Sequence, residues 1–102
     1  MGLTIDIERS SDETLVRVAG EVDLYSSPEL RKKILAAIPS VEGGLVVHLS
    51  EVTYIDSSGV ATLVEGLRSA RRHGTGFALM APSPAVMQVL ELARLDSVFE
   101  VR

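Results

Sequence analysis

The sequence predicts a single α/β domain, built on a mixed, mostly parallel sheet of four to five strands with three or more helices. Two short segments near the N-terminus alternate apolar and polar residues, which predicts a β-hairpin. Two nearly continuous apolar runs, 45–49 and 77–81, have the pattern of strands covered on both faces. Amphipathic segments separate these runs, and helices between strands imply parallel crossover connections.

The hairpin is predicted from the first twenty residues. Apolar and polar residues alternate over 3–8, which is the period of a half-buried strand. Polar residues at 10–13 form the expected turn. A second apolar stretch at 15–18 predicts the returning strand, which is closed by Ala19-Gly20.

The first helix is expected to begin at Ser26-Ser27-Pro28-Glu29. If Ser26 is the N-cap, Glu29 lies at the third helical position and completes a capping box. If Ser27 is the N-cap, Pro28 takes the favoured first position. Apolar residues then recur at helical spacing until Pro39, which stops the helix.

The remaining elements follow from the same signals. Residues 41–44 form the expected loop before the strand at 45–49. A second helix is predicted from about Ser58 to Arg72, with Gly74 as its C-cap. Ser83-Pro84 opens a third helix, and 98–101 forms a short last strand or tail. The predicted order is therefore β-β-α-β-α-β-α-β.

Composition restricts the classes of function. The 102 residues fit one domain, with 46% hydrophobic and 24% charged residues, as in soluble globular proteins. The net charge of −4 argues against a nucleic-acid binder. The absence of cysteine removes disulfides, thiol catalysis and thiolate metal sites. No apolar run approaches the ~18 residues that span a membrane, and no signal peptide is recognised. We therefore expect a cytoplasmic protein without membrane insertion.

The candidate functional site is the segment Ile55-Asp56-Ser57-Ser58-Gly59, between an apolar strand and the second helix. A serine hydroxyl there lies at the positive end of a helix, where free backbone N–H groups can meet a phosphate. The simpler interpretation is helix capping, worth about 1 kcal/mol. Two adjacent serines exceed what one cap needs. Gly59 is a poor helix former and is expected to keep the surface open for a partner. The segment therefore favours a phosphorylation switch.

Three segments together resemble a known family. They are Gly20-Glu21-Val22-Asp23-Leu24, the stretch at 46–60 that contains Asp-Ser-Ser-Gly, and the ending at 89–99. With them the chain resembles, nearly end to end, an anti-sigma-factor antagonist of the sulfate-transporter-and-anti-sigma-antagonist (STAS) domain family. The resemblance implies one STAS-like domain over residues 1–102 and a role in bacterial transcription regulation.

The resemblance also implies roles for individual residues. In that family the second serine of Asp-Ser-Ser-Gly is phosphorylated by a kinase that is itself the anti-sigma factor, which places the acceptor at Ser58. Asp56 and Asp23 match acidic residues near the acceptor, and Ser57 and Gly59 are surface neighbours. The implied protein binds the anti-sigma factor when unphosphorylated and releases it when phosphorylated, and a phosphatase resets it. No catalytic residue, cofactor or metal is expected, because the kinase brings ATP and the metal.

Two other functions stay open. STAS domains also serve as adaptor subunits of lipid or anion transporters, where the partner is a permease, and as scaffolds in stress-signalling assemblies. The complete Asp-Ser-Ser-Gly favours the antagonist, because transport adaptors can lack the acceptor serine. A hydrolase that uses Ser58 would need a base at the right spacing and is the weakest alternative.

Two features outside the loop have simpler interpretations. His48 lies in the apolar strand without a second histidine or a cysteine, so a hydrogen-bonded strand residue is expected rather than a metal ligand. Arg68, Arg71 and Arg72 are expected to form a solvated helix face. Contact of this cluster with an acidic patch on a partner is the less favoured alternative.

Overall fold

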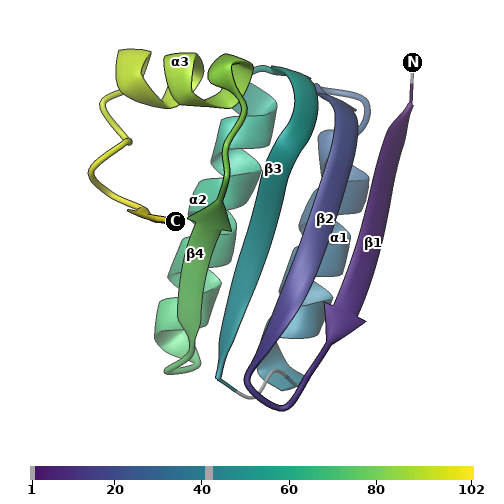
Figure 1. Cartoon of the computed structure of the whole chain (residues 1–102), viewed down its shortest axis with the longest axis vertical. Coiled ribbons are helices and arrows are strands. Elements are labelled where there is room, and N and C mark those ends of the chain that lie inside the picture. Colours follow the sequence, from purple (N-terminus) through teal and green to yellow (C-terminus); the bar gives the residue numbers. More distant parts are fainter. Residues whose placement is uncertain (1, 41–42) are drawn as a thin grey trace.

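The computed structural model describes residues 2–40 and 43–102 (Figure 1). Within them the elements follow in the order β1 (Leu3–Arg9), β2 (Glu13–Val22), α1 (Ser27–Ala37), the short 3-10 helix η1 (Ile38–Ser40), β3 (Gly44–Ile55), α2 (Ser57–Arg72), β4 (Gly76–Met80), α3 (Pro84–Leu92) and β5 (Glu100–Val101). The predicted order of strands and helices is confirmed. Residues 41 and 42, which belong to the predicted loop at 41–44, lie outside the described residues.

The five strands lie side by side in the order in which they occur in the chain. β1 and β2 are antiparallel, with Ile5 opposite Val18, and all other neighbours are parallel. Each parallel step passes through an α-helix, as in crossover connections. The expected mixed, mostly parallel sheet with an N-terminal hairpin is therefore confirmed.

The helices α1 and α2 lie next to each other against one face of the sheet, and α3 lies near the carboxyl ends of the parallel strands β3 and β4 (Figure 1). The core is formed between this helix pair and the sheet. The most deeply buried large side chains are Leu30, Ile34, Ile38, Leu45, Leu49, Leu63, Leu79 and Leu90. No helix in residues 2–40 and 43–102 is long and apolar enough to cross a membrane.

β3 is much longer than the apolar run at 45–49 predicts. Its first half pairs with β4, but the pairing ends at His48, and the second half continues beside β2 alone. Two register shifts, which are β-bulges or similar irregularities, interrupt the β2–β3 ladder, and such shifts break the alternation of apolar and polar residues. The extension matters because it carries Ile55 to the level of Val22 at the end of β2.

The free edge of this extension is covered by the start of α3. Ser83 N–H donates to the Leu49 carbonyl (3.2 Å), and Ser83 Oγ donates to the Val52 carbonyl (2.7 Å). Ser83 is also the N-cap of α3, because its Oγ accepts from Val86 N–H (3.3 Å). The predicted helix start at Ser83-Pro84 is confirmed. One buried serine thus caps a helix and satisfies a strand that β4 no longer reaches.

The predicted capping box at the start of α1 is wrong. Ser26 is the N-cap, but its side chain makes no cap hydrogen bond. Ser26 Oγ donates to the Glu21 carbonyl (2.7 Å) and accepts from Asp23 N–H (2.9 Å). The chain has already turned before the helix begins, since Ser27 N–H donates to the Asp23 carbonyl (2.8 Å). Ser26 therefore stabilises the β2–α1 loop, residues 23–26, which lies beside the candidate site.

Candidate functional site

The start of α2 is organised by Asp56. Its backbone is extended, and its Oδ1 accepts hydrogen bonds from Ser58 N–H (2.9 Å) and Gly59 N–H (3.2 Å). Val60 N–H donates to the Asp56 carbonyl (3.0 Å), which is the first bond of the helix. The acidic residue is therefore the N-cap, and two backbone donors that a helix end leaves unpaired are satisfied by one carboxylate oxygen.

The two serines occupy the first and second positions of α2. Ser57 is exposed, and Ser58 is half-buried at the rim of the core. Ser58 therefore lies where the sequence places it, at a helix start and outside the core. Its role as a phosphate acceptor stays a prediction at this point.

Gly59 does not have the role that the sequence suggested. It is buried, and a Cβ added there would lie 2.6 Å from Ile55 Cγ1 and 2.7 Å from Val22 Cγ1. The expectation that Gly59 keeps the surface open for a partner is therefore wrong. The absent side chain lets the first turn of α2 approach the ends of β2 and β3, so the constraint is internal packing.

Asp56 also joins α2 to the β2–α1 loop. Its Oδ2 accepts from Leu24 N–H (3.2 Å), and its own N–H donates to the Val22 carbonyl (3.1 Å). Asp23, the neighbour of Leu24, lies in the same loop. This arrangement agrees with the expectation, drawn from the family resemblance, that Asp23 and Asp56 both lie near Ser58.

The Asp23 carboxylate is used to fold its own loop. Its Oδ1 accepts from Tyr25 N–H (2.9 Å) and Ser26 N–H (2.9 Å), and the Ser26 hydroxyl lies 3.1 Å away. These donors, the Ser26 N–H foremost, outweigh partial desolvation and hold the pKa of Asp23 below its ordinary value of 3.8. Asp23 therefore carries a negative charge at neutral pH.

The structure adds two residues that the sequence analysis did not single out. Leu24 and Tyr25 project from the β2–α1 loop with 64% and 90% of their surface exposed. A sequence signal was present, because two apolar residues follow the end of β2 directly before the helix start at Ser26-Ser27-Pro28. Exposed apolar side chains that are clustered on a surface mark sites of protein contact.

In the part of the chain that the structure describes, no three His, Cys, Asp or Glu side chains come together to hold a metal ion. Both histidines make contacts elsewhere. The His48 ring meets the Ser50 hydroxyl (3.2 Å) on β3, as expected of a strand histidine, and the His73 ring meets the Ser69 carbonyl (2.8 Å) at the far end of α2.

Comparison with known proteins gives consistent results. The family model described as "Mlab, STAS domain" matches residues 5–100. The anti-sigma-B factor antagonist of Listeria monocytogenes is 30% identical over 105 residues, covering 100% of this chain and 90% of that protein. The crystal structure of an anti-sigma factor antagonist from Mycobacterium paratuberculosis is 29% identical with a TM-score of 0.88, covering 98% of this chain and 85% of that one.

A third match has the same fold at lower identity. It is the Bacillus cell fate determinant SpoIIAA in its phosphorylated form, which is 22% identical with a TM-score of 0.75. The alignment covers 97% of this chain and 91% of that one.

The packing role of Gly59 is testable. We expect Gly59→Ala to lower the free energy of unfolding by about 1–3 kcal/mol, because a methyl group would overpack the contact with Ile55 and Val22. Urea denaturation measures the change. The matched control is Ser57→Ala in the same turn, which is exposed and should stay within about 0.5 kcal/mol of the parent. A stabilised Gly59→Ala variant would mean that helix propensity outweighs packing at this position.

The hydrogen bonds to Asp23 predict a pH dependence. The pKa of Asp23 is lower in the folded state than in the unfolded state. Ionised Asp23 therefore stabilises the fold at pH values above 3.8, and this contribution is lost as the pH falls through the folded-state pKa. The difference in unfolding free energy between the parent and Asp23→Asn should be constant above about pH 5 and shrink below 3.8. Denaturation at a series of pH values measures it. A difference that is unchanged at strongly acidic pH would contradict the assignment.

Proposed function

This chain belongs to the STAS domain family, and on that premise we propose that it is an anti-sigma-factor antagonist. The proposed protein binds an anti-sigma factor while Ser58 is unmodified and releases it when Ser58 is phosphorylated. The relatives named as antagonists support the first part of this proposal. The observation that supports the second is the half-buried Ser58 at the second position of α2, beside Asp56.

The docking surface that we propose combines the serines with the β2–α1 loop. Leu24 and Tyr25 are exposed apolar side chains, and buried aromatic anchors commonly contribute most of the energy of a protein interface. The bond from Leu24 N–H to Asp56 Oδ2 holds these side chains beside the start of α2. A partner that covers Tyr25 would therefore also approach Ser58.

Phosphorylation of Ser58 would change this surface strongly. It adds about −1.5 to −2 charges. The helix end offers less compensation than a bare N-terminus, because Asp56 already accepts from the N–H groups of Ser58 and Gly59. In solution the phosphate is hydrated beside the carboxylate. Under a docked partner the two charges would have to be desolvated together, which is the costly arrangement.

The same charge would also act on the loop. A phosphate that competes with Asp56 for the N–H groups of α2 weakens the carboxylate's hold on Leu24 N–H. The apolar anchors would then lose their fixed position at the moment when repulsion rises. We therefore infer that modification acts on the partner both directly and through Asp56.

The protein itself supplies no catalysis in this scheme. The anti-sigma factor acts as the serine kinase and brings ATP and the metal, and a phosphatase removes the phosphate. The alternative of a transporter adaptor is not favoured, because the reported relatives are named as anti-sigma factor antagonists.

Substitution of Ser58 tests the switch. With the serine-kinase anti-sigma factor encoded in the same genome, we expect Ser58→Ala to bind as tightly as the parent and to remain unmodified by kinase and ATP. Ser58→Asp should bind at least about tenfold more weakly, because a charge is desolvated at the interface. Calorimetry gives the affinities and phosphosite mass spectrometry the modification. Ser57→Ala is the control and should be modified normally. Equal affinity of Ser58→Ala and Ser58→Asp would contradict the switch.

The apolar anchor is tested separately. We expect Leu24→Ala/Tyr25→Ala to weaken binding of the same partner by roughly tenfold or more, since truncation of a central aromatic anchor typically costs over 1 kcal/mol. The fold should be unchanged, because both side chains are exposed. Leu92→Ala is the matched control, since Leu92 is 79% exposed near the end of α3. If both variants bind like the parent, the β2–α1 loop is not part of the interface.

A further inference from the structure

The helices α1 and α2 hold most of the positive charge of the protein. Six of its ten lysines and arginines lie on them, all exposed, against two acidic residues, Glu29 and Glu65; the six are Arg31, Lys32, Lys33, Arg68, Arg71 and Arg72. The two helices therefore carry a net charge of +4, and the rest of the chain carries −8. Such a separation of charge within 102 residues makes the helix layer a distinct surface.

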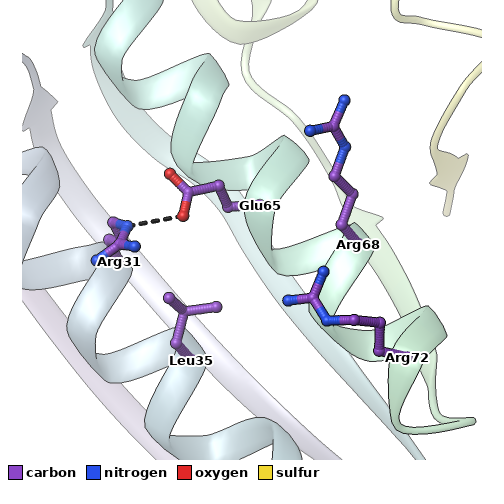
Figure 2. A pocket seen from close by; sticks show the side chains of 5 residues that line it. All are labelled: Arg31, Leu35, Glu65, Arg68 and Arg72. Carbon is purple, nitrogen blue, oxygen red and sulfur yellow. Dashed lines mark hydrogen bonds and ion pairs between the residues drawn. The ribbon is translucent and has the colours of Figure 1, made fainter.

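A groove of about 430 Å³ runs between the two helices on this surface. It is lined by Arg31 and Leu35 of α1 and by Glu65, Arg68 and Arg72 of α2 (Figure 2). Arg31 Nε and Glu65 Oε2 form an ion pair of 2.8 Å across it. The Arg72 guanidinium points from α2 toward the groove (Figure 2).

The two arginines of α2 that line the groove, Arg68 and Arg72, form no ion pair with any of the residues that the structure describes. Their spacing of four residues puts them on one face of the helix. The Arg31–Glu65 pair is itself half exposed, so Arg31 can exchange its partner at little cost.

Helix stability explains only part of this pattern. Cations in the last turn of a helix are favoured by the helix dipole, which accounts for Arg71 and Arg72. It does not account for Arg68, which lies one turn earlier, or for Arg31, since the last turn of α1 holds no basic residue. The helix dipole therefore does not explain why two of the three guanidinium groups of the groove, those of Arg31 and Arg68, lie there.

We propose that the groove between α1 and α2 binds a short acidic segment of a protein partner. Guanidinium groups form paired hydrogen bonds with carboxylates, and Leu35 offers an apolar contact between them. The groove is separate from the Ser58 surface. Arg68 and Arg72 follow Ser58 by ten and fourteen residues, which is about 15 and 21 Å along α2. A charge on Ser58 is screened over about 8 Å at physiological salt, so the groove stays available when Ser58 is phosphorylated.

The surroundings favour an acidic peptide over other anionic partners. The large exposed apolar side chains of the described residues are Leu24, Tyr25, Tyr54, Leu92, Val98 and Val101. All of them lie outside α1 and α2, so the basic face has no side chain to insert into a lipid surface. A long nucleic acid would be repelled by the rest of the protein, which carries a net charge of −8. No aromatic residue lines the groove to stack on a base.

The experiment uses the full chain, labelled with 15N, and a capped hexaglutamate peptide titrated at physiological ionic strength with NMR detection, so that the charge at residue 58 is screened from the groove. Capped hexaserine is the uncharged control. We expect shifts of amides around the groove, about tenfold weaker binding for Arg68→Gln/Arg72→Gln, and less than about threefold weakening for Lys32→Gln/Lys33→Gln. The second pair removes the same charge from α1 outside the groove lining. Ser58→Glu should bind the peptide like the parent, so the result does not depend on the proposed switch.

Three results would overturn the proposal. The first is equal weakening by the two double variants, which would show attraction to net charge alone. The second is a titration that leaves the groove amides unmoved. The third is tighter binding to the groove of a DNA duplex or of phosphatidylserine vesicles, which would assign the face to another polyanion. If Arg68→Gln/Arg72→Gln does not fold, Arg31→Gln replaces it, because it removes the third guanidinium and leaves α2 unchanged.

Discussion

One carboxylate holds the site together. Asp56 accepts hydrogen bonds from two N–H groups of α2 and from Leu24 N–H of the β2–α1 loop, and its own N–H donates to Val22 at the end of β2. A helix start, a loop and a strand end thus share one anchor. It fixes the backbone of Ser58 at the helix start and the backbone of Leu24 in the loop. A negative charge added beside this carboxylate therefore perturbs a junction of three elements, whereas the same charge at an ordinary helix start would perturb one.

The second half of β3 makes this junction possible. Because β3 continues past the end of its pairing with β4, Ile55 reaches the level of Val22, and the two side chains close under Gly59. Ser83 satisfies the edge that β4 leaves uncovered. The start of α2 therefore packs closely against the ends of β2 and β3. This packing depends on Gly59, on the length of β3 and on Ser83, which caps α3. That closeness brings the first turn of α2 within hydrogen-bond reach of the neighbouring loop.

The sequence predicted what depends on local pattern. Periods of two and of 3.6 residues identified the hairpin and the helices, and nearly continuous apolar runs identified the buried strands. The Asp-Ser-Ser-Gly segment located the candidate site. The errors occurred where contacts that the local pattern does not encode decide. The length of β3 was missed because register shifts break its alternation. Ser26 matched a capping box, yet the Asp23 turn gave its hydroxyl other partners. Gly59 was expected to keep the surface open for a partner, because Val22, which packs against it, is remote in sequence.

The two surfaces of the molecule differ in the sign of their charge, and this difference shapes what phosphorylation can do. The Ser58 end already presents Asp23 and Asp56, and a phosphate adds about two further negative charges there. The groove keeps its positive charge, because Arg68 and Arg72 lie about 15 and 21 Å from Ser58 along α2, beyond the Debye length of about 8 Å at physiological salt. Phosphorylation of Ser58 would therefore increase the charge difference between the two surfaces and would not change its sign. If both proposals hold, the protein would lose its partner at the Ser58 surface while an acidic segment stays bound in the groove, so release from one partner would not mean release from all.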